Sequence, residues 1–307
     1  MTFSPRALIA VAAYASLYAV SLLRLATAPG FEAGESLAAL LVFGVLFSAI
    51  AWIATRGARP PPSAVRDPPR ETAVLILYLA AFAVLVLGIG LSAVREALGV
   101  APRQALAILG LKLASMVVAP AALFTLLGYP WRDQLRWREF GAVGWRCFGV
   151  MALLLALLQA VAGRGLQTLA ASDASLVAIM LAAPLALAWE SIEAGLCEEF
   201  LFRALLQTRL SAWLRSETAG IVAMTLLFGL AHAPGYVLRG AHAAEGLADA
   251  PDPLTAAAYA VVVVSPLGLM FGVLWSRTRN LWLLVLLHGW TDLFPNLVAF
   301  MRTWQLG

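Results

Sequence analysis

Residues 176–203 read LVAIMLAAPLALAWESIEAGLCEEFLFR. The first half is an unbroken apolar run of the kind that crosses a bilayer, which takes about 20 residues of helix. The second half carries four carboxylates and a guanidinium. An ionised group near the bilayer centre costs at least about 2.5 kcal/mol, so charges placed there indicate a functional site. The stretch therefore predicts a membrane helix with a polar site in it.

The whole chain has the composition of a membrane protein. Its 307 residues are 62% hydrophobic and 12% charged, whereas soluble proteins average roughly 45–50% and about 25%. Apolar runs near the length that spans a bilayer occur at 7–25, 36–55, 72–92, 105–127, 147–163, 176–189, 220–238, 254–276 and 281–301. We therefore expect an all-α, polytopic membrane helix bundle with about 8–9 transmembrane helices.

Two of these runs leave the number of spans open. The first follows Arg6 and ends before Ala26-Thr27-Ala28, as a signal peptide does, but Pro29 disfavours cleavage and we expect an uncleaved helix. The run from 176 continues to 207, too long for one straight crossing at about 1.5 Å per residue. A kink or break is expected at Pro184 or Gly195, and a break would reverse the orientation of every later span.

The net charge of +4 does not point to nucleic acid, because the arginines are dispersed among loops. They follow the positive-inside rule if the N-terminus is cytoplasmic. The Ala- and Arg-rich composition with almost no lysine is typical of a GC-rich bacterial genome, and no alternating strand pattern of an outer-membrane barrel occurs. We expect the cytoplasmic membrane of a bacterium, with the lipid bilayer as one partner.

Residues 1–171 contain helices but no recognisable motif. A Pro- and Arg-rich segment at 56–71 is expected to be an extended cytoplasmic loop, either a plain tether or a site that recruits a partner. The segment 129–146 alternates aromatics with arginines, which predicts an interfacial helix, with the gripping of a lipidated substrate as an alternative. In the loop 240–253, His242 is expected to be solvated. The chemistry is expected in 172–307.

Two adjacent glutamates, Glu198 and Glu199, are expected to differ in how far a nearby positive charge neutralises them. Glu199 and Arg203 are four residues apart, so they share a helix face and pair. Glu198 is rotated by about 100° from that face and is the less neutralised carboxylate. The spacing predicts that Glu199 and Arg203 form a structural ion pair and that Glu198 is the reactive group.

Two of the three histidines of the chain lie in later apolar runs. Phe228 precedes His232 by four residues, and Gly229 between them permits close helix approach. His288 precedes Asp292 by the same interval, which lets the carboxylate hold one tautomer of the imidazole. A histidine alone on a helix is most often a structural residue, so neither pair carries a function by itself.

Together, E-E-x-x-x-R, F-x-x-x-H and H-x-x-x-D on three successive apolar segments resemble the motifs of the CPBP family, the CAAX-protease and bacteriocin-processing intramembrane proteases. The resemblance covers roughly 176–301. It implies a catalytic helical core with a hydrophilic cavity, and a glutamate-type intramembrane endopeptidase that cuts a membrane-associated protein or peptide without a metal or other cofactor. By position, Glu198 activates water with His232 as its partner, His288 and Asp292 stabilise the oxyanion, and Glu199, Arg203 and Phe228 support them.

One position departs from the family pattern, where asparagine is common in place of Asp292. An amide donates a hydrogen bond to an oxyanion, whereas an ionised carboxylate does not. Asp292 is therefore expected to orient and charge His288, which then acts as the donor. Asn296, one turn further on, is an alternative source of an amide.

Other functions stay open at this stage. Two histidines and two carboxylates would also suit zinc or iron, although no H-E-x-x-H is present. A non-catalytic protein for bacteriocin immunity or complex assembly would keep the same scaffold. A transporter could use the carboxylates as a proton relay, but the paired broken helices of transporters are not visible. Cys197 is a weak candidate for a nucleophile, because adjacent helical residues such as Glu198 do not face it.

Overall fold

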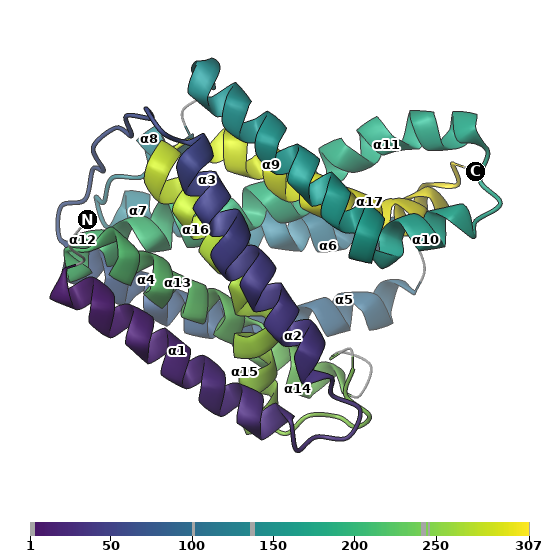
Figure 1. The fold of residues 1–307 in the computed structure, drawn as a ribbon, viewed down its shortest axis with the longest axis horizontal. Coiled ribbons are helices and arrows are strands. Elements are labelled where there is room, and N and C mark those ends of the chain that lie inside the picture. The colour runs from purple at the N-terminus through teal and green to yellow at the C-terminus, as the bar shows by residue number, and fades with distance from the viewer. Residues whose placement is uncertain (1–3, 100–101, 136–138, 241–243, 245, 307) are drawn as a thin grey trace.

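The structure is a computed structural model that describes residues 4–99, 102–135, 139–240, 244 and 246–306. These residues form helices and no strands (Figure 1). In the described ranges, nine helices are long and apolar enough to cross a membrane: Pro5–Leu25, Ala33–Ala54, Pro68–Leu98, Arg103–Leu126, Gly141–Ala162, Leu176–Leu214, Glu217–Leu238, Pro253–Thr278 and Leu281–Trp304. The prediction of an all-α polytopic bundle is confirmed, and the chain is a multi-pass membrane protein.

Several spans are built from shorter helical elements that follow one another directly. The η elements among them are π-helical, with a wider turn than an α-helix. Residues 4–170 contain α1 (Pro5–Leu25), α2 (Ala33–Ala39), η1 (Leu40–Phe47), α3 (Ser48–Ala54), α4 (Pro68–Phe82), η2 (Ala83–Gly90), α5 (Leu91–Leu98), α6 (Arg103–Leu113), η3 (Ala114–Val118), α7 (Ala119–Leu126), α8 (Arg132–Leu135), α9 (Gly141–Ala162) and α10 (Arg164–Ala170). The remainder contains α11 (Leu176–Glu190), η4 (Ser191–Leu196), η5 (Glu199–Gln207), α12 (Thr208–Leu214), α13 (Glu217–Ala231), α14 (Ala233–Arg239), α15 (Pro253–Tyr259), η7 (Ala260–Val264), α16 (Ser265–Thr278) and α17 (Leu281–Trp304).

Local capping explains where several spans begin. The side chains of Ser4, Ser175, Ser216 and Asn280 each accept a hydrogen bond from the backbone N–H three residues further on. The first N–H groups of a helix have no partner within the helix, so a side-chain oxygen at this position stabilises the start. Residues of this type just ahead of an apolar run therefore determine these helix starts.

The extended loop predicted for 56–71 is shorter in the structure. Asp67 caps α4, and the two prolines that follow it occupy the first turn, where a missing N–H and a fixed φ are favourable. Glu71 is thus a helical residue, fully buried against Arg209. Arg209 departs from the expectation that the arginines lie in loops, because it is fully buried in α12.

The segment 129–146 does not form one interfacial helix. The structure has the short helix α8 and then starts α9 at Gly141, so Trp145 and Arg146 belong to the first turns of a spanning helix. Both side chains are exposed, which suits the boundary between lipid and water. Residues 136–138 and His242 lie outside the described residues, so the predictions made for them stay predictions.

The run that starts at Leu176 is one uninterrupted helix of 39 residues. Its ends, α11 and α12, lie at opposite sides of the molecule (Figure 1). Pro184 is accommodated inside α11. Gly195 marks a close contact rather than a break, because a Cβ there would lie 2.6 Å from the carbonyl oxygen of Val285 in α17. The expected break is therefore wrong, and α17 crosses this long helix at η4.

Candidate active site

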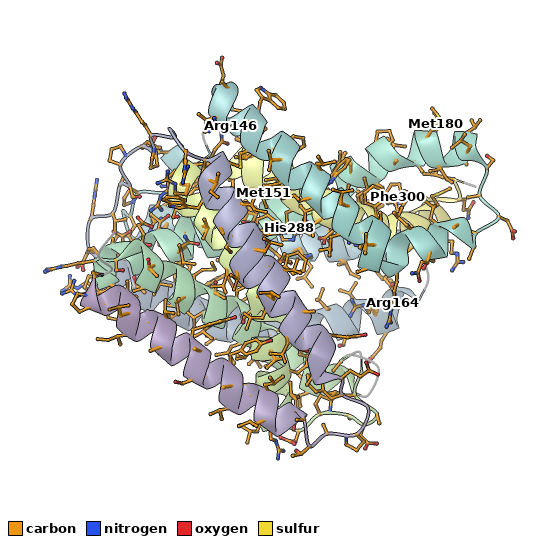
Figure 2. The ribbon with its side chains drawn as sticks, in the orientation of Figure 1. Arg146, Met151, Arg164, Met180, His288 and Phe300 are labelled. Carbon is orange, nitrogen blue, oxygen red and sulfur yellow. The ribbon has the colours of Figure 1, made fainter. Side chains whose placement is uncertain are left out.

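The predicted site residues come from three helices that meet inside the bundle. Glu198 and Glu199 lie where η4 passes into η5 on the long helix, His288 and Asp292 lie on α17, and His232 ends α13. Glycines allow the helices to meet. A Cβ at residue 289 would lie 2.7 Å from the backbone nitrogen of Ser191 in η4. In Figure 2 His288 lies near the middle of the molecule, and its side chain is buried.

Glu199 is the central anion of the site. Its Oε1 lies 2.7 Å from Nδ1 of His288 and 3.0 Å from Nη1 of Arg203, and both Glu199 and Arg203 are fully buried. Nδ1 of His288 is the donor of this hydrogen bond, and the carboxylate oxygen of Glu199 accepts it. The predicted ion pair of Glu199 and Arg203 is present, and Glu199 holds the tautomer of His288. The sequence had assigned that task to Asp292.

Aromatic rings hold the guanidinium of Arg203. Its Cζ lies 4.5 Å from the ring centre of Phe228 and 5.5 Å from that of Phe271. Nη1 lies near Glu199 but is not aligned for a hydrogen bond. The cation therefore relies on the ring faces and on the nearby anion. His288 stacks on the other partner, Phe271, with centroids 5.0 Å apart, so one aromatic cluster positions both residues.

The second nitrogen of His288 faces two carboxylates. Nε2 lies 3.5 Å from Oδ2 of Asp292 and 3.8 Å from Oε2 of Glu198. Both side chains keep some exposure, 28% and 16%, whereas Glu199 has none. Because Nδ1 is engaged by Glu199, Nε2 is the nitrogen of His288 that is open to chemistry.

His232 is anchored through its own helix. Its Nδ1 lies 2.8 Å from the carbonyl oxygen of Phe228, and the two rings form an edge-to-face pair with centroids 5.1 Å apart. A carbonyl only accepts, so Nδ1 is the donor and Nε2 is left for the cavity. The described residues show no direct hydrogen bond between His232 and Glu198, and the two side chains meet only at the cavity that both of them line.

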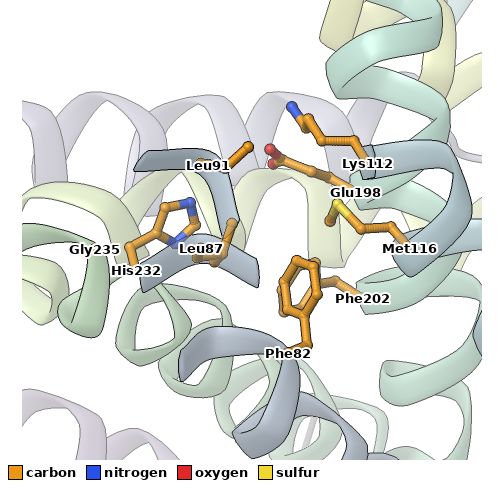
Figure 3. A pocket seen from close by; sticks show the side chains of 9 residues that line it. All are labelled: Phe82, Leu87, Leu91, Lys112, Met116, Glu198, Phe202, His232 and Gly235. Atoms are coloured by element: carbon orange, nitrogen blue, oxygen red, sulfur yellow. The ribbon is translucent and has the colours of Figure 1, made fainter. Parts of the chain in front are cut away.

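A cavity of about 160 Å³ brings Glu198 and His232 together. Figure 3 shows the two side chains facing it from different helices. Its walls include the apolar residues Phe82, Leu87, Leu91, Met116 and Phe202, together with Gly235 and the polar Lys112. At about 30 Å³ per water in the liquid, this volume has room for several water molecules beside the carboxylate.

Three charged residues of this region were not assigned a role from the sequence. Lys112 of α6 lies 2.9 Å from Oε1 of Glu193 in η4. Glu190 is buried and interacts electrostatically with Asp292 and Glu193. A signal was present, because Lys112 is a charge inside an apolar run. Its partner on the long helix was not apparent from spacing.

Two residues weighed as alternatives lie apart from the cavity. Asn296 is exposed on α17, and Cys197 is a fully buried free thiol that does not line the cavity. Among the residues that the structure describes, no group of three or more His, Cys, Asp or Glu side chains has an arrangement that could hold a metal ion.

Comparison with protein families gives one match. Residues 180–294 match the family described as type II CAAX prenyl endopeptidase Rce1-like. The matched segment contains Glu198, His232, His288 and Asp292. Comparisons with curated proteins and with solved structures found no match. The family is one of peptide hydrolases. Residues 180–294 of this membrane protein are thus similar to the Rce1-like CAAX endopeptidases, which belong to the CPBP family.

Proposed function

We propose that the protein is a glutamate-type endopeptidase that hydrolyses a peptide bond of a membrane-associated protein or peptide in the cytoplasmic membrane of a bacterium. The observation that carries the proposal is the position of Glu198. Its carboxylate lines a cavity within the spanning helices together with His232, and it faces Nε2 of His288. This arrangement supports the proposal, because hydrolysis of a peptide bond needs a base, an imidazole partner and water in one place.

Amide hydrolysis requires a base for water, a stabiliser for the tetrahedral oxyanion and a proton for the leaving amine. Glu198 takes the proton from a water molecule in the cavity while the oxygen attacks the carbonyl carbon. When the C–N bond breaks, the protonated Glu198 gives the proton to the amine. His232 lines the opposite wall of the cavity, where its Nε2 is available to accept a hydrogen bond from the attacking water.

His288 supplies stabilisation for the oxyanion. Nδ1 of His288 keeps its proton because it donates a hydrogen bond to Glu199. A second proton on Nε2 therefore makes the ring an imidazolium, and the carboxylate of Asp292, 3.5 Å from Nε2, stabilises that positive charge. The N–H of that nitrogen then donates to the developing negative charge on the substrate oxygen. Asp292 acts through His288, because an ionised carboxylate has no proton to donate.

The test replaces the base with its amide. Cleavage in wild-type cells creates new termini of membrane proteins. We expect these termini to be absent from cells that carry Glu198→Gln, because loss of a general base lowers the rate by roughly 10²–10⁴-fold. Quantitative proteomics of protein termini measures this. The matched control is Glu96→Gln, since Glu96 is an exposed carboxylate at the end of α5, and its pattern of termini should equal that of the wild type.

Unchanged cleavage in the Glu198→Gln strain would contradict the proposed function. Immunity or complex assembly that survives the same substitution, with no termini lost, would favour the non-catalytic alternative. The proposal also holds that hydrolysis needs no metal. Cleavage in isolated membranes that stops with a chelator and returns with zinc or iron would contradict that part.

A further inference from the structure

Lys112 is unusual within this sequence. It is the one lysine of the chain, whose 21 basic residues are otherwise arginines. It lies in α6, inside a spanning helix, and outside the segment 180–294 that matches the peptidase family. A cation in such a place is costly unless it is paired, and it marks a functional position by default.

The surroundings of Lys112 are those of the candidate active site. Its Nζ lies 2.9 Å from Oε1 of Glu193, and the side chains are only 12% and 19% exposed. Lys112 also lines the cavity that contains Glu198 and His232. Figure 3 shows the amine and the carboxylate of Glu198 at the same end of the cavity, with His232 across from them. A lysine from the N-terminal half thus completes the wall next to the proposed base.

The charges around Glu198 explain what this cation does. The region holds five carboxylates: Glu190, Glu193, Glu198, Glu199 and Asp292. Arg203 is already paired with Glu199, and its guanidinium packs on the ring of Phe228. Lys112 is a cation that lines the cavity together with Glu198, at the same end of it (Figure 3). Without it, Glu198 would face several like charges with less compensation, which disfavours its ionised form.

We infer that Lys112 is a positioning residue of the active site, anchored by Glu193, whose ammonium keeps the Glu198 carboxylate ionised and ready to take a proton from water. The inference rests on the proposed function of Glu198. It also assigns the N-terminal helices a part in the chemistry, because α6 delivers a charge that the matched segment does not contain.

A structural ion pair is the competing interpretation, and a double variant separates the two. Lys112→Met removes the positive charge and leaves the partly buried Glu193 without its partner. Lys112→Met combined with Glu193→Gln removes both charges of the pair. If the lysine only neutralises Glu193, the double variant recovers wild-type cleavage. If it acts on Glu198, the double variant stays impaired, by roughly 100-fold as for a misplaced catalytic group.

The pH dependence of cleavage supplies a readout that a structural role does not move. The ionisable groups that face Lys112 are Glu190, Glu193, Cys197 and Glu198, and His288, His232 and Arg203 face Glu198. Loss of a cation makes a neighbouring carboxylate harder to ionise. We therefore expect the acid side of the pH–activity profile to move to higher pH in Lys112→Met and in the double variant. Lys112→Arg should retain the wild-type profile.

The experiment uses the full-length protein in proteoliposomes, with a substrate peptide taken from termini that depend on Glu198. Arg103→Met on the same helix is the control, since Arg103 is exposed, and it should match the wild type. Recovery in the double variant, or an unshifted pH profile in Lys112→Met, would overturn the inference while the loss in Glu198→Gln still stands. Activity in Glu198→Gln would instead overturn the proposed function itself.

Discussion

At the level of single residues, Glu199 makes two contacts, although its spacing in the sequence indicates only one of them, the contact with Arg203. One carboxylate oxygen serves both the guanidinium of Arg203 and Nδ1 of His288. A fully buried anion with two cationic or donor partners is stable only while all of them are present. Glu199 therefore couples the stability of the bundle to the tautomer of the histidine beside Glu198.

Glu199→Gln is expected to lower the free energy of unfolding by about 3–5 kcal/mol, because it leaves the charge of Arg203 buried without a counterion. Cleavage should fall too, since His288 loses the group that fixes its tautomer. Denaturant titration in detergent micelles measures the first effect. Glu198→Gln offers a contrast, because it should abolish cleavage with a smaller change in stability. Equal stability of Glu199→Gln and wild type would contradict the buried pair.

At the scale of helices, the site depends on how closely α17 approaches η4. Gly195 and Gly289 sit on the two sides of this crossing, and each faces the backbone of the other helix. Small residues at such crossings let helix backbones pack closely in a membrane, where apolar surface alone gives little preference for a neighbouring helix over lipid. This approach is what brings His288 within hydrogen-bond distance of Glu199.

Gly289→Ala is expected to destabilise the protein by about 1–3 kcal/mol through overpacking, because the added Cβ would lie 2.7 Å from the Ser191 backbone nitrogen. It should also reduce cleavage by moving α17 away from the glutamates. Thermal unfolding and the cleavage assay measure the two effects. Gly149→Ala in α9 is the control, since nothing lies within 4 Å of its Cβ. A gain of about 0.5–1 kcal/mol is expected there.

At the scale of the whole molecule, both halves of the chain contribute to one hydrophobic core. It contains Leu75 of α4 and Met151 of α9 together with Phe200 of η5. Polar contacts join the halves as well: Tyr14 bonds to Ser265, and Trp290 donates to the carbonyl oxygen of Ala152. The helices without a motif are thus packed directly on those that carry the site.

The buried pair of Glu71 and Arg209 is the sharpest test of that connection, because it joins α4 to α12 with both side chains fully buried. Glu71→Gln should cost about 3–5 kcal/mol of unfolding free energy by leaving Arg209 unpaired. The matched control is Arg70→Gln, which breaks an ion pair with Asp67 whose arginine is 81% exposed. That change should cost about 0–1 kcal/mol. Denaturant titration that finds equal losses would contradict the prediction.

Features that depend on neighbours along the chain could be predicted from the amino-acid sequence. Apolar runs of spanning length predicted the helices, and the interval of four residues predicted the contacts of Glu199 with Arg203 and of Phe228 with His232. Capping residues and prolines also act locally, although the start of α4 at Pro68 was missed because two prolines were taken to exclude a helix rather than to begin one.

Contacts between distant segments of the chain could not be predicted in this way and became known from the packed fold. It placed Glu199, and not Asp292, at Nδ1 of His288, and it brought Lys112 to Glu193 beside the proposed base. The spacing of side chains along one helix does not specify which face of another helix those side chains contact. That choice depends on close packing at crossings such as the one of Gly195 and Gly289, and on the need to pair every charge that the bundle buries.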